Sequence, residues 1–277
     1  MNLRAGNPPF RVGAVQMVSG PDVAANLAVA APLIGAAVGQ GARLVVLPEY
    51  FGIFGERATD KVDAKEIDGD GPQQRFLAEQ ARHHGIWLIG GTVPIACDDR
   101  ARVRSACLVY APDGERVARY DKIHLFAFTR GEERYDEGRT IQPGTERQTF
   151  DIPIGKVGLS VCYDVRFPEL YRGLGEVALI LVPAAFTATT GAAHWHLLLR
   201  ARAVENQCYV LAAAQGGVHG GRRRTYGHSL LIDPWGEIVA EHDDGPGVVV
   251  GDVDPARVAA VRTELPALGH RVFTHGL

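Results

Sequence analysis

The sequence predicts an α/β protein, arranged as a four-layer α-β-β-α sandwich of two mixed sheets with helices on both outer faces. Strand and helix patterns alternate over residues 10–89, which is typical of a sheet flanked by helices. Later strand patterns are joined in pairs by short turns that contain glycine or proline, so antiparallel pairing is also expected. About ten or more strands against four or five helices are too many for one well-covered sheet, and two sheets packed face to face fit better.

The alternating part of the chain has recognisable helix ends. Asp22 is a candidate N-cap for an alanine-rich helix, inside which Pro32 should kink or divide the helix. A second helix opens at Asp70-Gly71-Pro72 and should stop at Gly85. The expected elements are a strand over 10–17, a helix over 23–38, a strand over 44–47, a helix over 72–85 and a strand over 86–89.

The second part of the chain is dominated by hairpins. The expected hairpins join 103–110 to 115–120, 148–152 to 156–161, and 229–232 to 237–241. Between the last two lie a helix that starts near Pro168, a strand over 178–182, a helix over 192–207 and a strand over 208–213. Because no repeat or linker divides the chain, the sequence predicts one domain over 1–277, with a core of about 10–253 and a tail over 254–277.

Charge and composition restrict the classes of partner. The formal net charge of -3 comes from 29 Lys and Arg against 32 Asp and Glu, which are well mixed along the chain. Nucleic-acid binding needs a concentrated basic face, so no such partner is expected. The run Arg222-Arg223-Arg224 is interpreted either as a solvated loop or as a group that meets a substrate carboxylate.

The sequence gives no sign of a membrane, a metal or a cofactor. No apolar stretch approaches the roughly 20 residues needed to cross a bilayer, and there is no signal-peptide pattern, so we expect a soluble cytoplasmic protein. The sequence has no C-x-x-C and no H-E-x-x-H, and on a helix His194 and His196 would face different directions. The four cysteines are expected to be free thiols: Cys97, Cys107, Cys162 and Cys208.

Cys162 ends the apolar run 156–161 and is followed by charged and proline-bearing sequence. Such a run is typical of a buried strand, and open α/β sheets bind ligands beyond the carboxyl ends of their strands. If a helix starts at Pro168, backbone N–H groups after Cys162 point to one small volume, which suits a lowered thiol pKa and an oxyanion. The alternative is a packed core thiol, because free Cys is among the most buried residue types.

Two charged residues share the strand-end setting of Cys162. Glu49 follows the strand over 44–47, and Lys122 follows the second strand of the first hairpin. Taken singly, each is an ordinary solvated charge at a strand end. Taken together with the thiol, they supply the base, the electrostatic stabiliser and the nucleophile of an acyl-transfer site.

On these residues the chain resembles the nitrilase superfamily of carbon–nitrogen hydrolases. The superfamily's Glu-Lys-Cys triad matches Glu49 in Leu-Pro-Glu-Tyr, Lys122 in Tyr-Asp-Lys-Ile-His-Leu-Phe and Cys162 in Val-Cys-Tyr-Asp-Val-Arg-Phe-Pro-Glu. The similarity runs from about residue 10 to residue 273, and it implies the same α-β-β-α sandwich that the number of strands predicts.

The resemblance also implies a second glutamate. Glu137 matches that position, and Glu132 and Glu133 are nearby alternatives. Its implied role is either to orient the substrate amide or to hold Lys122.

The resemblance narrows the substrate class. Tyr163-Asp164 follows the nucleophile as in the amidase branches, whereas nitrile-hydrolysing members have Trp-Glu. The stretches 184–195, 200–209 and 226–236 are similar to the branch that contains ω-amidase and deaminated-glutathione amidase. This implies hydrolysis of a small carboxylate-bearing primary amide with release of ammonia, the substrate being deaminated glutathione or an ω-amide such as 2-oxoglutaramate. Another C–N substrate (an N-carbamoyl amino acid, an aliphatic amide or a nitrile) is the alternative, because Ala127 and the loop 218–224 depart from the branch.

The implied mechanism gives each residue a role. Glu49 accepts the thiol proton and returns it to the leaving nitrogen, while Lys122 and a backbone N–H stabilise the oxyanion. Arg166 is interpreted either as an ion-pair partner of Glu169 or as a counterion for a substrate carboxylate. The candidate substrate-binding residues are Tyr163, Arg166, Phe186, His194 and Trp195, with Tyr50 and Phe51 as further aromatic candidates for the pocket wall or for plain packing. The resemblance implies no cofactor and a homodimer or larger homo-oligomer.

Three rival interpretations agree less well with the sequence. Gly158-Leu-Ser160-Val-Cys162 is one residue short of a G-x-S-x-G elbow, so Ser160 would lie inside the strand rather than on an exposed turn. A papain-like pair of Cys162 with His194 lacks that family's flanking sequence. A non-catalytic scaffold on the same fold would have no chemical reason to keep all three reactive side chains.

Overall fold

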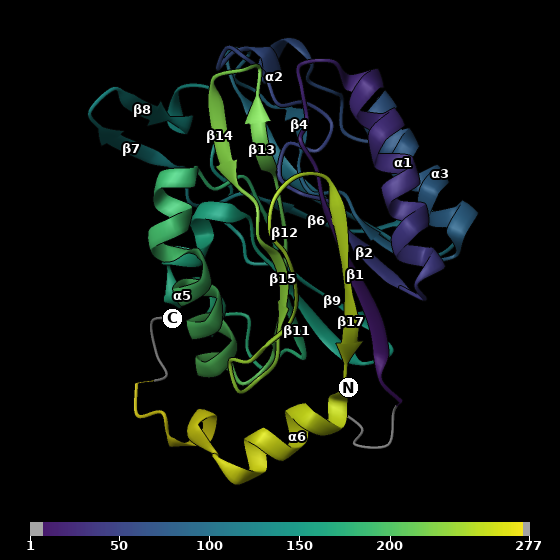
Figure 1. Cartoon of the computed structure of the whole chain (residues 1–277), viewed down its shortest axis with the longest axis vertical. Helices are drawn as coiled ribbons and strands as arrows, with labels where there is room; N and C mark the ends of the chain where they lie inside the picture. The colour runs from purple at the N-terminus through teal and green to yellow at the C-terminus, as the bar shows by residue number, and fades with distance from the viewer. Residues whose placement is uncertain (1–7, 274–277) are drawn as a thin grey trace.

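Two mixed sheets lie face to face in the computed structural model, which describes residues 8–273 (Figure 1). The first sheet consists of β1 (Phe10–Gln16), β2 (Leu44–Val46), β3 (Trp87–Ile89), β4 (Val93–Ala96), β5 (Val103–Tyr110), β6 (Arg116–Asp121) and β17 (Gly247–Val253). The second sheet consists of β9 (Thr149–Ile152), β10 (Gly155–Leu159), β11 (Leu179–Ala184), β12 (Tyr209–Ala214), β15 (Ser229–Ile232) and β16 (Ile238–His242). The three expected hairpins are present as β5–β6, β9–β10 and β15–β16.

Each sheet has a parallel centre and antiparallel margins. The strand orders are β17-β1-β2-β3-β5-β4, with β6 on β5, and β16-β15-β12-β11-β10-β9. Strands β1, β2 and β3 run parallel, and so do β10, β11 and β12. The predicted combination of parallel and antiparallel pairing is therefore confirmed in both sheets.

Helices cover the outer face of each sheet, which completes the predicted four layers. Helices α1 (Val23–Gly39) and α3 (Pro72–His84) pack on the first sheet, and α4 (Pro168–Arg172) and α5 (Ala188–Asn206) lie on the side of the second. Helix α6 (Pro255–Glu264) runs across one end of the molecule (Figure 1). The opposite end carries α2 (Asp60–Asp63) and two small hairpins, β7 (Ala127–Arg130) with β8 (Glu133–Asp136) and β13 (Gly216–His219) with β14 (Arg223–Tyr226).

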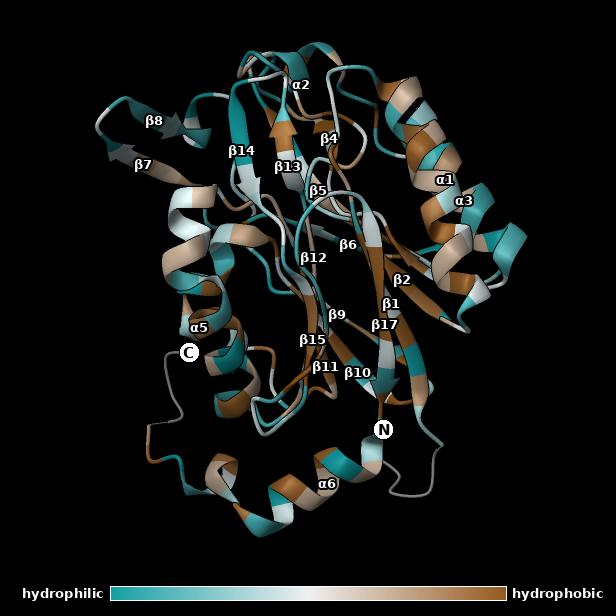
Figure 2. Ribbon diagram, viewed as in Figure 1, coloured by the Kyte–Doolittle hydropathy of each residue, from teal (hydrophilic) through white to brown (hydrophobic). Residues whose placement is uncertain are grey.

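Alternation along the strands separates the two hydrophobic layers. In β1 the side chains of Val12 and Ala14 pack between the sheets, whereas Val15 packs against the helices of the first sheet. In β2, Leu44 and Val46 face the other sheet, and Val45 faces the helices. Figure 2 shows these strands as continuous hydrophobic segments. Burial on both faces explains why the sequence over 44–47 reads as an apolar run.

Several details differ from the expectations. Pro32 lies inside α1 without dividing it. The helix expected from 192 begins at Ala188, because the side chain of Thr187 accepts a hydrogen bond from the Thr190 N–H and caps it earlier. The helix expected at Pro168 is the short α4, and a 3-10 turn, η2 (Cys162–Arg166), precedes it.

The predicted tail over 254–277 contains α6 and a 3-10 turn, η3 (Ala267–His270), while 274–277 lie outside the described residues. Within residues 8–273 no helix is both long and apolar enough to pass through a bilayer.

Gly91 lies in close contact with the loop that leads to Glu49. Gly91 follows β3 with a φ of 49°, and a Cβ built on it would lie 1.9 Å from the Pro48 carbonyl oxygen. An L side chain there meets both the strain of the left-handed region and a backbone clash. Gly85, the C-cap of α3, has a similar φ of 63° but has nothing within 4 Å of a Cβ.

These two glycines give a matched pair of substitutions. Gly85→Ala should cost about 1–2 kcal/mol of unfolding free energy, from backbone strain alone. Gly91→Ala should cost at least about 3 kcal/mol, because the Pro48 backbone must also move. Urea denaturation of the two variants measures the difference, and equal losses would show that the close approach to Pro48 has no energetic consequence.

Candidate active site

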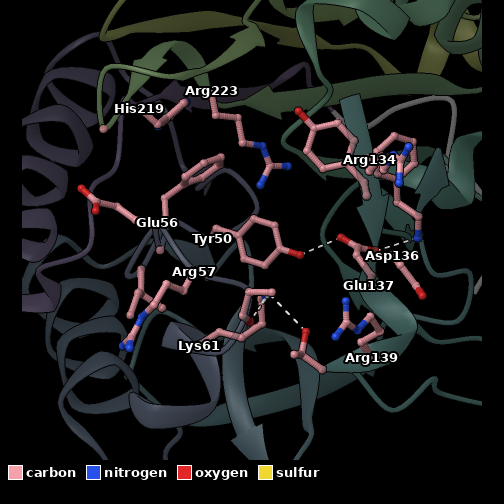
Figure 3. A pocket seen from close by; sticks show the side chains of 18 of the residues that line it. Tyr50, Glu56, Arg57, Lys61, Arg134, Asp136, Glu137, Arg139, His219 and Arg223 are labelled. Carbon is pink, nitrogen blue, oxygen red and sulfur yellow. Dashed lines mark hydrogen bonds between the residues drawn. The ribbon is translucent and has the colours of Figure 1, made fainter. Parts of the chain in front are cut away.

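A fully buried lysine lies between two carboxylates at the end of the molecule that carries the small hairpins. The Lys122 Nζ donates hydrogen bonds to Glu49 Oε1 at 2.7 Å and to Glu137 Oε2 at 2.8 Å. The side chains of Lys122 and Glu49 are 0% and 1% exposed. Glu137 also accepts hydrogen bonds from the Tyr50 hydroxyl at 2.7 Å, visible in Figure 3, and from the Phe126 N–H at 2.7 Å. Every charge in this group therefore has a partner, which burial requires.

Different elements deliver these side chains. Glu49 follows β2 of the first sheet, Lys122 follows β6 of the same sheet, and Glu137 opens the 3-10 turn η1 (Glu137–Arg139) after β8. Cys162 follows β10 of the second sheet and begins η2. The expected meeting of strand ends from separate parts of the chain is therefore present in the structure.

Cys162 is held on a sharp turn beside Glu49. Its φ is 51°, in the left-handed region, and its thiol lies beside the Glu49 carboxylate, close enough to act on the pKa of that group. The backbone of Ala185, just after β11, lies near the sulfur and acts to lower the pKa of the thiol. The residue is buried but lines a small pocket together with Phe126, Tyr163 and Phe186.

The two carboxylates have opposite pKa shifts. Burial raises the pKa of Glu49, and the charge of Glu137 adds to this, so the pKa lies above its usual value despite Lys122. Burial also acts to raise the pKa of Glu137, but Lys122, the Phe126 N–H and the Tyr50 hydroxyl outweigh it and the pKa is lowered. Burial alone would lower the pKa of Lys122, yet the charges of Glu137 and Glu49 raise it well above its usual value. Carboxyl groups whose pKa values are pushed apart are typical of acid–base sites, where one stays ionised and the other exchanges a proton.

The thiol of Cys162 does not have the lowered pKa that we expected from the sequence. Burial raises its pKa well above the usual value, and the charge of Glu49 raises it further, while Lys122 and the Ala185 backbone act in the opposite direction. The resting group is therefore a neutral thiol. It needs a base at the moment of reaction, and the Glu49 carboxylate lies beside it.

Asp164 connects the residues on either side of Lys122 to the residue before Cys162. We did not predict this role. Its carboxylate accepts hydrogen bonds from the Tyr120 hydroxyl at 2.7 Å and from the His124 N–H at 3.0 Å, on either side of Lys122. It also accepts the Val161 N–H at 2.8 Å, next to Cys162. A signal was present in the sequence, because an Asp three residues after the apolar run 156–161 must be paired if it is buried.

Glu49 is anchored from the second sheet as well. The Gln215 side chain, which follows β12, donates to the Glu49 carbonyl oxygen at 3.0 Å and to Ser19 Oγ at 2.9 Å. The N–H of Tyr50, whose φ is 59°, donates to Thr92 Oγ1 at 2.9 Å. Gln215 ends an apolar run just as Glu49 does, so the same strand-end reasoning applied to 208–213 would have found it.

The predicted substrate-binding residues fall into two groups. Tyr163 and Phe186 line the small pocket with Cys162, and the Arg166 guanidinium lies over both rings, 5.5 and 5.3 Å from their centroids. Two placements need correction. His194 is exposed on α5, and its Nδ1 lies 3.3 Å from the Arg166 guanidinium. It lines neither the small pocket of Cys162 nor the larger cleft described below. Trp195 is 0% exposed and donates to the His228 carbonyl oxygen at 2.8 Å, so it supports Phe186 from behind.

Of the two interpretations of Arg166, the structure does not show the ion pair with Glu169. Among the ion pairs of residues 8–273, none joins Arg166 to Glu169. Phe51, the other aromatic candidate, is fully buried and stacks on Phe76. It belongs to the core between the first sheet and its helices.

A large basic cleft of about 730 Å³ adjoins the small pocket, with Phe126 in the wall of both. Tyr50 and Glu137 lie on its floor, and Lys61 and Arg223 point into it (Figure 3). The charged residues that line it are Arg57, Lys61, Arg134, Arg139, Arg222 and Arg223 against Glu56, Asp136 and Glu137. Because Glu137 is already paired with Lys122, the cleft has a clear excess of positive charge.

Two cations in the cleft have few partners. The Lys61 Nζ donates to the Ala58 carbonyl at 3.0 Å and to Thr140 Oγ1 at 3.4 Å, and burial lowers its pKa. The Arg223 guanidinium lies 4.7 Å from the Phe54 ring centroid and 5.0 Å from that of Tyr135, and its buried Nε has no hydrogen-bond partner within the described residues. Nothing in the sequence around Lys61 indicates this position, because it lies in a polar segment that looks like an exposed helix.

The rival nucleophile is ruled out by packing. Ser160 is 0% exposed, donates to the Leu181 carbonyl oxygen at 2.9 Å and accepts from the Tyr171 hydroxyl at 2.9 Å. Its hydroxyl is a structural group inside the second sheet. His194, the partner that a papain-like mechanism would need, lies at Arg166 rather than in the pocket of the sulfur.

Comparisons with known proteins agree with this geometry. The carbon-nitrogen hydrolase family matches residues 11–263. The chain is 41% identical over 271 residues to a deaminated glutathione amidase of Synechocystis sp., covering 96% of this chain and 99% of that one, and 38% identical over 265 residues to the omega-amidase NIT2 of Danio rerio, covering 95% and 94%. The crystal structure of Saccharomyces cerevisiae Nit3, a member of branch 10 of the nitrilase superfamily, superposes with a TM-score of 0.87 at 32% identity over 98% of this chain and 99% of that one. The chain therefore belongs to the carbon–nitrogen hydrolase family and, as the resemblance to the nitrilase superfamily implies, is a hydrolase of carbon–nitrogen bonds other than peptide bonds.

Proposed function

We propose that the chain hydrolyses the C–N bond of a small carboxylate-bearing amide through a thioester on Cys162. The observation that carries the proposal is the contact of a neutral thiol with a carboxylate of raised pKa, beside a buried lysine. These groups supply a nucleophile, its base and a cation for the oxyanion in one place.

In the first half of the reaction the sulfur attacks the amide carbon while its proton passes to Glu49. The negative charge that develops on the carbonyl oxygen is stabilised by Lys122 and by the Tyr163 N–H, which lies in the first turn of η2, where backbone N–H groups lack helical partners. One such donor lowers a barrier by about 3–4 kcal/mol. The intermediate then breaks its C–N bond, and Glu49 returns the proton to the departing nitrogen.

In the second half a water molecule hydrolyses the thioester. Glu49, ionised again, takes a proton from the water as the oxygen attacks the acyl carbon. The C–S bond breaks, the acid product leaves, and the proton held by Glu49 restores the thiol. No group other than the substrate and water is consumed.

Glu137 has a positioning role in this scheme. Its two oxygens accept hydrogen bonds from Tyr50, Phe126 and Lys122, and its lowered pKa keeps it ionised. These contacts favour holding Lys122 over orienting the substrate amide. The same contacts favour Glu137 over Glu133, which accepts a hydrogen bond from Thr189 instead.

The cleft supports a carboxylate-bearing substrate. Among the described residues no carboxylate forms an ion pair with Lys61 or Arg223, and a carboxylate is the group that a guanidinium and an ammonium bind best. The named relatives suggest two substrates of this kind, deaminated glutathione and an ω-amide such as 2-oxoglutaramate. A cleft of about 730 Å³ is larger than a compact ω-amide needs and favours the longer molecule.

The two substrates differ in their leaving groups, and this corrects the expectation of ammonia release in every case. An ω-amide is a primary amide and releases ammonia. Deaminated glutathione is a secondary amide of cysteinylglycine, so its hydrolysis releases that dipeptide. A homodimeric or larger assembly is a further proposal that rests on the resemblance, and a cytoplasmic location is a proposal that rests on the sequence pattern alone.

Purified protein assayed against a panel of amides tests the function directly. Deaminated glutathione or an ω-amide should be turned over faster than N-carbamoyl amino acids, aliphatic amides and nitriles.

Cys162→Ala should remove turnover while the fold is retained, as checked by circular dichroism. Lys122→Met should lower kcat/KM by more than about tenfold, or about 1.4 kcal/mol; a smaller loss contradicts the oxyanion role.

The pH profile tests the division between the two carboxylates. Glu49 must be ionised to accept the thiol proton, so kcat/KM should fall as the pH drops through its raised pKa. The charge of Glu137 helps to raise that pKa, so Glu137→Gln should move the acid limb to lower pH while reducing kcat/KM about tenfold or more. Tyr50→Phe removes a hydrogen bond but no charge and should leave the limb near its original place. An unmoved limb in Glu137→Gln would show that Glu49 is not the group that titrates.

Substitutions on β14 test recognition of the carboxylate. Arg223→Ala should raise KM for a carboxylate-bearing amide about ten- to a hundredfold, since a hydrogen bond to a charged group contributes about 1.5–3 kcal/mol. A neutral aliphatic amide should be unaffected. Arg224→Ala, the matched control, removes a charge that pairs with Asp244 outside the cleft. Equal losses on charged and neutral amides would mean that Arg223 only packs between Phe54 and Tyr135.

A further inference from the structure

Three side chains with metal-binding donor atoms converge away from the active site. His196 lies on α5, His228 in the turn between β14 and β15, and Glu241 on β16. His196 Nε2 and His228 Nδ1 both contact Glu241 Oε1, at 2.6 and 2.7 Å. The three donor atoms lie within 4.8 Å of one another. None of these residues lines the basic cleft or the pocket of Cys162.

The two nitrogen–oxygen spacings are close to those that a tetrahedral ion needs, and the two nitrogens lie within 4.8 Å of each other. Zinc bonds to imidazole nitrogen and carboxylate oxygen are about 2.0–2.2 Å long, which places neighbouring ligands about 3.3 Å apart in a tetrahedron. Each nitrogen–oxygen distance here would have to lengthen by roughly 0.6 Å. Rotation of exposed parts of the side chains is enough for such a change, because they are 29%, 26% and 23% exposed. The same exposure leaves room for water as the fourth ligand.

The surrounding contacts hold His228 in place without using its Nδ1. Its φ of 56° is in the left-handed region, and its N–H donates to the Asp243 carbonyl oxygen at 2.8 Å. Its carbonyl accepts the indole N–H of Trp195, and its ring stacks on Tyr226 with centroids 4.3 Å apart. A ligand that is already oriented loses little freedom when it binds an ion, which favours binding.

We propose that His196, His228 and Glu241 form a binding site for a divalent transition-metal ion of the zinc class. Two imidazoles and one carboxylate with an open fourth position are a recurrent zinc ligand set. The sequence predicted no metal site because these donors are not closely spaced along the chain. Here the donors come from three segments, so only the fold brings them together.

The bound ion would fasten α5 to the second sheet. His196 is on the helix, while Glu241 belongs to β16 at the sheet margin and His228 precedes β15. Thr190, about 1.7 turns before His196 on α5, lines the pocket of Cys162. The site is therefore separate from the reacting groups but shares a helix with the pocket wall.

Metal titration of the untagged full-length protein tests the proposal. The Cys162→Ser background removes the active-site thiol as a competing ligand. Zn²⁺ binding is followed by calorimetry and Co²⁺ binding by visible absorption, where one saturable ion per chain with a tetrahedral Co²⁺ spectrum is expected. His196→Ala and Glu241→Gln should each weaken binding at least about tenfold. Circular dichroism checks that both variants are folded, and Glu241→Gln keeps the size of the side chain.

Two histidine variants serve as controls. His194→Ala removes the neighbouring imidazole on α5, which contacts Arg166 instead of Glu241, and should bind the ion as tightly as the parent. His83→Ala disrupts the adjacent His83–His84 pair on α3 and should also leave the affinity unchanged. The proposal is overturned if no saturable binding occurs, if folded His196→Ala binds as tightly as the parent, or if His83→Ala abolishes binding. Any of these outcomes leaves the three residues as a hydrogen-bonded cluster alone.

Discussion

The buried ammonium of Lys122 between Glu49 and Glu137 is the interaction on which the site depends. Removing an ion from water costs several kcal/mol even after the protein relaxes, so a buried lysine persists only where anions surround it. Both contacts are shorter than 3 Å, and Glu137 is itself held by Tyr50 and Phe126. Loss of Lys122 would leave two buried carboxylates without a cation, and loss of either carboxylate would leave Lys122 with a single anion. The site is therefore a single electrostatic unit rather than three independent residues.

The two-sheet architecture makes that unit possible. Glu49 and Lys122 come from one sheet, whereas Cys162 comes from the other, so the reacting groups meet only when the sheets pack. Asp164 fixes the relation between them, because it accepts hydrogen bonds from both sides of Lys122 and from the residue before Cys162. Gln215 adds a second tie from the other sheet to the Glu49 backbone. Packing between sheets thus brings together the groups of the proposed reaction as well as burying apolar surface.

The limits of the sequence-based prediction follow from what a linear pattern contains. Strand ends can be read from apolar runs, so the meeting of Glu49, Lys122 and Cys162 was predictable. The pKa of the thiol was not, because it depends on how much of the sulfur is buried and on which charges face it. Trp195 was predicted to line the pocket because the sequence does not show which face of a helix an aromatic residue occupies. The carboxylate of Asp164 was passed over because its partners lie about 40 residues away, across the sheets.

In the proposed reaction the number of anions that face Lys122 stays the same. In the resting state two anions, Glu49 and Glu137, face one cation. In the proposed attack the thiol proton neutralises Glu49 while a new negative charge forms on the substrate oxygen, so Lys122 still faces two anions. The buried charge changes place without changing in amount, and the surrounding dipoles need little reorganisation. The opposite pKa shifts of the two carboxylates serve this exchange, because one takes up the proton and the other keeps its charge throughout.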